Sequence, residues 1–201
     1  MRSNPRDDVT QLRRRIAVEA ARLIAEQGLR DFHLAKRKAA LNLGLGDSSP
    51  LPRNTEIEEA LREHQRLFQG HIQPAQLHEL RETAIEAMGF FKRFQPRLVG
   101  AVLEGTADAG SAICLHLFHD NFAEVIAFLD ENRIPFEQQD RELRYSADMR
   151  ERYPALLFSA GGTAIDVTVF ALDGLRRAPL DRISERPMRR ATLESVQALT
   201  R

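Results

Sequence analysis

The sequence of 201 residues predicts an α+β fold, with a helical N-terminal region over residues 1–96 and a mixed sheet with flanking helices over residues 97–201. In the first region apolar residues recur near the 3.6-residue period of an amphipathic helix. In the second region apolar runs of strand length alternate with helical segments. Pro96 closes the helical region, since proline cannot continue a helix.

Four helices are expected in the first region, over residues 9–27, 31–43, 56–68 and 75–94. The first stops at Gly28, and Asp31 is the expected N-cap of the second. In this second helix we expect four apolar residues to face inward and three consecutive basic residues to be displayed together. The former are Leu34, Ala35, Ala39 and Leu41, and the latter are Lys36, Arg37 and Lys38.

The second region contains five runs with strand character: residues 98–103, 113–118, 142–145, 155–159 and 164–170. The run at 142–145 carries charges and lies near a proline, which favours an edge strand. Gly161 and Gly162, between the last two runs, predict a hairpin turn. A helix is expected over residues 120–133, and a last short helix begins after Thr192 as its N-cap.

Composition limits the class of protein. Formal net charge is zero, with a mildly basic front and a mildly acidic back, so strong non-specific attraction to nucleic acid is not expected. No apolar run approaches the roughly 20 residues of a membrane helix, and the first residues lack the apolar segment of a secretory signal. We therefore expect a cytoplasmic protein without a membrane partner. Cys114 cannot form an internal disulfide, because it is the single cysteine, and it is interpreted as a core residue.

Residues 98–118 form two apolar runs around a connection rich in small residues. Their layout resembles the signature of the nucleotidyltransferase superfamily, in which an apolar residue, Gly and Gly or Ser precede a short spacer and then aspartate, apolar, aspartate, apolar. Here Val99, Gly100 and Ala101 match the first part, and residues 102–111 match the spacer. Ala112 and Cys114 stand where the family has the two aspartates that hold Mg²⁺ ions. The resemblance implies a nucleotidyltransferase-like fold over about half of the chain.

In the resembled family a third carboxylate comes from a later strand beside this motif. Asp166 occupies such a position, as an acid in the otherwise apolar run of residues 164–170. It is the candidate catalytic residue. The alternation of apolar and polar residues in the run equally predicts an outward-facing side chain with no catalytic role.

Other residues could replace the missing aspartates. By the period-two rule Cys114 and His116 share one strand face, and with Asp166 they would form a nitrogen, sulfur and oxygen set that suits zinc better than magnesium. The chain lacks the paired spacing of a strong metal motif. We therefore expect no metal site, and interpret His116 as a packed or surface histidine.

The segment from Gly105 to Ser111 offers small residues, backbone N–H groups and two hydroxyls, which are the materials of a phosphate-binding loop. It lacks the lysine of a P-loop, so a Walker-type NTPase is excluded. In the resembled fold this segment lies against the nucleotide, which makes Gly100, Gly105, Thr106 and Ser111 the candidate nucleotide-binding residues. The alternative is a tight connection that needs small residues for steric reasons.

The resemblance leads us to expect a catalytically impaired protein that retains a nucleotide-sized cleft or a macromolecular contact surface, with a nucleotide, an RNA or a protein as partner. The first alternative is an active nucleotidyltransferase with rearranged metal ligands, for which Mg²⁺ would be the cofactor. Nothing in the sequence assigns an oligomeric state.

A second alternative comes from another class of protein. Residues 19–32 and 34–46 resemble the start of a TetR-type helix-turn-helix module, which would use Arg13, Arg14 and Arg15 together with residues 36–38 on DNA. The chain departs from that pattern at residues 49–52, where two prolines stand in place of a recognition helix. We therefore expect no DNA binding.

Overall fold

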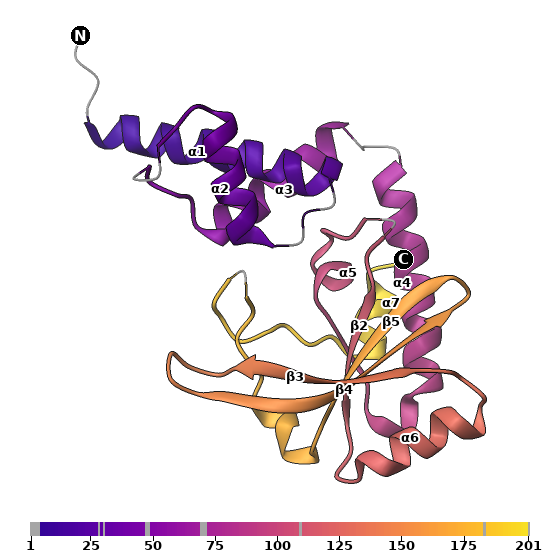
Figure 1. Ribbon diagram of the computed structural model, residues 1–201. Helices are drawn as coiled ribbons and strands as arrows, with labels where there is room; N and C mark the ends of the chain where they lie inside the picture. Colours follow the sequence, from indigo (N-terminus) through magenta and orange to yellow (C-terminus); the bar gives the residue numbers. More distant parts are fainter. Residues whose placement is uncertain are drawn as a thin grey trace. The chain divides into compact units, whose positions relative to one another are not determined.

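The computed structural model describes residues 5–27, 29, 31–46, 49–68, 72–108, 110–182 and 184–200 (Figure 1). The chain divides into two compact units, residues 1–73 and 74–201. The first holds helices α1 (Pro5–Gln27), α2 (Phe32–Asn42) and α3 (Asn54–Phe68). The α+β class expected from the sequence is confirmed, because the second unit combines helices with a five-stranded mixed sheet.

The second unit is built from strands β1 (Arg97–Val99), β2 (Ile113–Phe118), β3 (Glu137–Arg144), β4 (Arg150–Ala160) and β5 (Thr163–Phe170). Its α-helices are α4 (Ile72–Phe90), α5 (Ala101–Glu104), α6 (Phe122–Glu131) and α7 (Leu193–Ala198). Two 3₁₀ turns, η1 (Lys92–Phe94) and η2 (Leu172–Arg176), follow α4 and β5. None of the described helices has both the length and the apolar character needed to cross a membrane.

The three helices of the first unit pack through alanines and larger apolar side chains. Ile16, Ala20 and Leu23 of α1 meet Ala39 of α2 and Ile57 of α3, and all five are fully buried. Alanine allows α1 and α2 to approach closely, because its methyl group fills little space between helices. Asp31 is confirmed as the N-cap of α2, since its Oδ1 accepts hydrogen bonds from the backbone N–H groups of residues 33 and 34.

The leucines of α2 correct one sequence expectation. Leu34 and Leu41, expected to face inward, are 51% and 66% exposed. The buried positions are Ala35, Ala39 and Ala40. The leucines lie seven residues apart, so they share a face with each other but not with the alanines that contact α1. Close alanine packing, rather than the larger apolar side chains, therefore fixes the orientation of this helix.

The sheet of the second unit has the strand order β1-β2-β5-β4-β3. Strand β2 pairs antiparallel with β1 and parallel with β5, and the remaining neighbours are antiparallel. The runs that begin at residues 98, 113 and 164 are therefore neighbours in one mixed sheet. The two later strands are longer than expected and form one long hairpin from residue 137 to residue 160.

One face of the sheet carries the core of this unit. Leu115, Leu117 and Val167 pack there with Met88 and Phe91 of α4, and α6 adds further apolar side chains. Helix α4, which we expected in a helical region ending at residue 96, thus belongs mainly to the sheet unit. The boundary falls between residues 73 and 74 because the apolar stripe of α4 is buried against the strands.

The first strand is shorter than the apolar run that predicted it. Strand β1 ends at Val99, and Ala101–Glu104 form α5 rather than a continued strand. Between them Gly100 has φ +73° and ψ −156°, a conformation that is essentially restricted to glycine. This residue therefore turns the chain out of the sheet, and Val102 and Leu103 are buried from a helix instead.

Candidate functional site on the polar face of the sheet

The motif that resembles the nucleotidyltransferase signature converges with the candidate carboxylate. Cys114 of β2 and Asp166 of β5 are Cα partners in the parallel pair. Gly100 lies beside them, since a Cβ atom added to it would be 3.7 Å from the Cβ of Cys114. The turn after β1, the start of β2 and the acid of β5 therefore meet at one place, as the resemblance implies.

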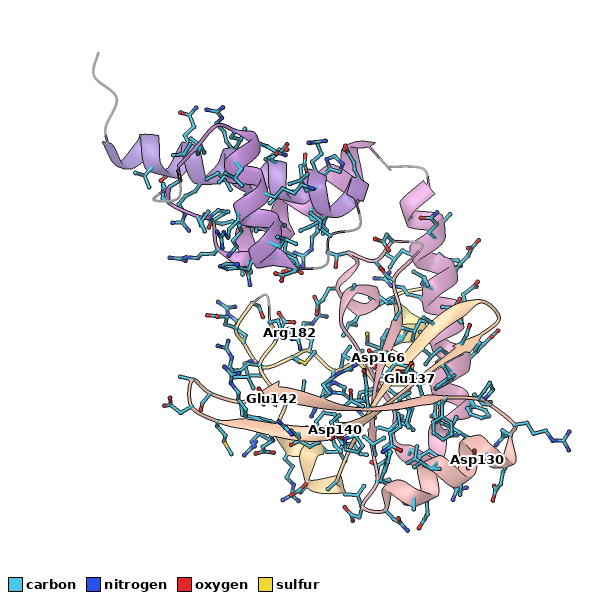
Figure 2. The ribbon with its side chains drawn as sticks, viewed as in Figure 1. Asp130, Glu137, Asp140, Glu142, Asp166 and Arg182 are labelled. Atoms are coloured by element: carbon cyan, nitrogen blue, oxygen red, sulfur yellow. The ribbon has the colours of Figure 1, made fainter. Side chains whose placement is uncertain are left out.

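Asp166 lies on the face opposite the core, as the alternation in its strand predicted (Figure 2). Oδ2 of Asp166 accepts a hydrogen bond from Nη2 of Arg141 at 2.7 Å, and Nη1 of Arg141 donates to Oγ1 of Thr168 at 2.9 Å. The two charged side chains are mostly buried, with exposed fractions of 18% for Asp166 and 23% for Arg141. Oδ1 of Asp166 is buried and accepts no hydrogen bond from the described residues. The candidate catalytic carboxylate is thus held in an ion pair.

His116 stands two residues further along β2, as the Cα partner of Thr168. Its side chain is on the same face and only 3% exposed. Nε of Arg190 donates to Nδ1 of His116 at 3.1 Å. Burial, assisted by the charges of Arg190 and then Arg141, lowers the pKa of His116 to about 3. The imidazole is therefore neutral at physiological pH.

Arg190 reaches this face from the segment that follows η2. Its guanidinium lies 4.9 Å from the ring centres of both Phe118 and Phe170, which stack on each other. Nη1 donates to the carbonyl of Gly174 at 2.6 Å, while Nη2 is buried without a hydrogen-bond partner among the described residues. Burial lowers the pKa of Arg190. Ala191, the residue after Arg190, is held by two backbone hydrogen bonds with Leu98 of β1, at 2.9 and 3.0 Å.

The metal-binding chemistry of the resembled family has no ligand set here. Ala112 has no ligating side chain, and the thiol of Cys114 lies 3.8 Å from the carbonyl of Ala112. Among the residues that the structure describes, no three His, Cys, Asp or Glu side chains gather closely enough to hold an ion. Cys114, His116 and Asp166 share one face, but Arg141 and Arg190 occupy the positions beside them.

The small-residue connection is closed on itself. Oδ1 of Asp108 accepts hydrogen bonds from the Gly110 amide and the Ser111 hydroxyl, and Oγ of Ser111 accepts from the Asp108 amide. The Thr106 amide donates to the carbonyl of Ala101. Gly105, with φ +80°, ends α5. The amides of Gly105, Thr106, Asp108, Gly110 and Ser111 are therefore engaged in hydrogen bonds with neighbouring residues, and the side chain of Asp108 stabilises the turn.

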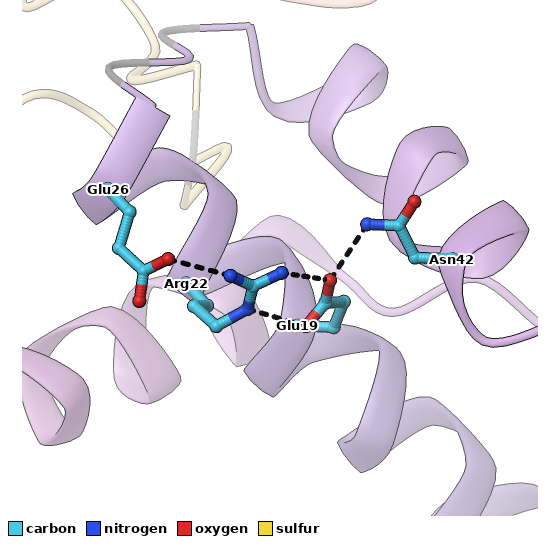
Figure 3. A network of polar contacts seen from close by, with 4 residues as sticks. All are labelled: Glu19, Arg22, Glu26 and Asn42. Carbon is cyan, nitrogen blue, oxygen red and sulfur yellow. Dashed lines mark hydrogen bonds and ion pairs between the residues drawn. The ribbon is translucent and has the colours of Figure 1, made fainter.

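The first unit was the candidate DNA reader. Its helices α2 and α3 are separated by residues 43–53, whereas the two helices of a helix-turn-helix are joined by about 3–4 residues. Arg13 is paired with Glu56 at 2.5 Å rather than displayed. Arg22 binds both Glu19 and Glu26, as Figure 3 shows. Arg14, Arg15, Arg37 and Lys38 are exposed, whereas the connection from α2 to α3 is longer than the turn before a recognition helix.

A polar network also ties α1 to α2. Oε1 of Glu19 accepts from Nδ2 of Asn42 at 2.9 Å as well as from Arg22 (Figure 3). The hydrogen bond from Arg22 lowers the pKa of Glu19. Because this carboxylate joins the two helices, it has a structural role within the first unit.

Sequence reasoning missed both arginines of the polar face. Arg141 lies in a charged stretch that indicated only an edge strand over residues 142–145. Had that strand been extended by one residue, the alternation of its side chains would have assigned Arg141 to a face of the sheet. Arg190 lies in an irregular tail with no periodic signal.

Compared with known proteins, the chain matches no family model and no curated protein.

Proposed function

We propose that the second unit is a nucleotidyltransferase-like domain that binds its ligand without catalysing two-metal phosphoryl transfer. The observation that carries this proposal is the ion pair between Asp166 and Arg141, formed directly beside Cys114. A carboxylate at that place is needed to hold metal ions, and here its charge is already neutralised by a fixed cation.

The charges support the proposal quantitatively. At an effective dielectric constant of about 20, a divalent ion about 4 Å from the guanidinium of Arg141 is repelled by about 8 kcal/mol. The carboxylate of Asp166 attracts the ion by a similar amount, so the pair offers no net attraction. The cost of dehydrating Mg²⁺ then stays uncompensated, because Ala112 and Cys114 add no negative charge.

The test is a transfer assay with Mg²⁺ or Mn²⁺, each labelled nucleoside triphosphate, and RNA and protein acceptors. We expect no label transfer above background for the wild type or for Asp166→Ala. Transfer by the wild type that is lost in Asp166→Ala would overturn the proposal and move the ligand role to Glu104, Asp108 or Asp120.

A gain-of-binding experiment checks the physical reason. The triple variant Ala112→Asp, Cys114→Asp, Arg141→Ala restores three carboxylates and removes the fixed cation. It should bind Mn²⁺, detected by loss of the free-ion signal in electron paramagnetic resonance. The matched control keeps Arg141 and carries only the two new aspartates, and it should bind Mn²⁺ more weakly. Equal binding by these two variants, or binding by the wild type, would show that Arg141 does not exclude the metal.

A further inference from the structure

Two arginines from distant parts of the sequence flank one buried histidine on the polar face. Arg190 donates directly to Nδ1 of His116. Arg141 donates to Thr168, which is the Cα partner of His116 on the neighbouring strand. Burial first, and then the charges of Arg190 and Arg141, lower the pKa of His116. The positive charges of both arginines therefore reach this imidazole.

This face holds hydrogen-bond donors that nothing in the described chain accepts. Since Nδ1 of neutral His116 is an acceptor, its proton lies on Nε2, and that atom has no hydrogen-bond partner among the described residues. Nη2 of Arg190 is likewise unpaired within the described chain. Arg141 has five N–H groups, of which one bonds Asp166 and one bonds Thr168. One acceptor on this face, Oδ1 of Asp166, is also unpaired among the described residues. The unpaired N–H groups outnumber it, so the excess is of donors, which is what an anion requires.

Among the described residues of this face, one positive charge has no carboxylate to compensate it. Arg141 is balanced by Asp166. Arg190 has no carboxylate partner in the part of the chain that the structure describes, where its contacts are two carbonyls, an imidazole and two aromatic rings. The nearby Glu151 is bound by Tyr153 and Arg177. A half-buried charge without a counter-charge is unusual in a folded protein.

We propose that this face binds a phosphate-type anion, with Arg141 and the Nε2–H of His116 as donors, in the field of Arg190 and without a metal ion. This inference rests on the proposed function and names the ligand class of the same site. Guanidinium groups suit a phosphate because their planar N–H pairs match two of its oxygens. Because Arg141 is already paired with Asp166, Arg190 supplies the uncompensated positive charge, in place of the Mg²⁺ of the resembled family.

The experiment is isothermal titration calorimetry of the full chain at constant ionic strength in EDTA, with inorganic phosphate, pyrophosphate and ATP as separate ligands. At least one should bind, and added Mg²⁺ should not strengthen binding. Arg141→Gln should weaken it about tenfold or more. The matched control is Arg150→Gln, since Arg150 lies on the same hairpin, is exposed, and pairs with Glu142 at 3.0 Å. That variant should keep the wild-type affinity.

Arg141→Gln leaves Asp166 unpaired and could unfold the domain, so Arg141→Gln/Asp166→Asn is made beside it and checked by circular dichroism. This double variant removes both charges and should fold without binding. Wild-type affinity in the folded double variant, no binding of any ligand by the wild type, or binding only with Mg²⁺ would each overturn the inference. Label transfer in the assay above would contradict the proposed function, whereas absent binding without transfer would contradict this inference alone.

Discussion

Nη2 of Arg141 lies 2.7 Å from Oδ2 of Asp166, while the other oxygen of that carboxylate is buried without a hydrogen-bond donor among the described residues. The carboxylate therefore depends on one arginine for its compensation. Strand β4 separates β5 from β3, which carries the arginine, so the pair also links an edge strand to the middle of the sheet.

The first prediction concerns this pair. Arg141→Gln should lower the free energy of unfolding by about 2 kcal/mol, because it leaves a mostly buried carboxylate without its cation. Adding Asp166→Asn should restore part of the loss, since the amide carries no charge. Urea denaturation of both single variants and the double variant measures the coupling. Additive effects would mean that the two side chains do not stabilise one another.

The second prediction concerns pH. The pKa of His116 is about 3 in the folded protein against 6.5 ordinarily, so between these values the unfolded chain binds a proton that the folded chain does not. Stability contributed by this residue should therefore fall as pH decreases below about 6.5, by up to about 1.4 kcal/mol per pH unit. Denaturation of the wild type and His116→Gln at pH 7, 6 and 5 isolates the effect. Glutamine can still accept from Arg190, and parallel curves for the two proteins would contradict the prediction.

The third prediction tests the turn after β1. Gly100→Ala should destabilise the protein by about 1–3 kcal/mol, because φ +73° with ψ −156° strains any residue with a side chain. The added Cβ meets no atom closer than 3.7 Å, so backbone strain is the cause rather than a clash. Gly89→Ala is the control with the opposite sign. Gly89 lies within α4 with open space around it, and alanine there should stabilise by about 0.5–1 kcal/mol.

The fourth prediction tests the orientation of α2. Ala39→Leu should cost about 1–3 kcal/mol by overpacking the contact with α1. Leu41→Ala should change stability by less than about 0.5 kcal/mol, since this leucine is exposed. Thermal denaturation of the two variants decides the matter, and a larger loss for Leu41→Ala would restore the orientation that the sequence suggested.

The sequence predicts those helices and strands in which polar and apolar residues repeat with the period of the element. Strand β5 and helix α1 were recognisable because polar and apolar residues follow the geometry of the element throughout. The apolar run at residues 98–103 has no such alternation. A short apolar run of this kind does not distinguish a buried strand from a buried helix. The end of β1 at Val99 is set instead by the backbone conformation of Gly100.

The candidate site was predictable only where a motif carries it. Cys114 and Asp166 were placed together by the resemblance, and the register of β2 and β5 agrees. Arg141 binds Asp166 only because two further strands bring it within reach, a relationship fixed by pairing register rather than by local pattern. The closed turn at Asp108 was not predictable either. The sequence is the same whether the aspartate side chain bonds to the turn or leaves its amides open.

The two backbone hydrogen bonds between Leu98 and Ala191 join residues far apart in the sequence, and we expect them to form late in folding. They hold Arg190 over a histidine that lies 74 positions earlier in the chain. Contacts between such distant residues form slowly, because a long loop must close before they can stabilise anything. The sheet can therefore assemble from residues 97 to 170 before the second arginine arrives. During that interval the histidine lacks its hydrogen-bond donor and can take up a proton, so refolding should become slower in mildly acidic solution.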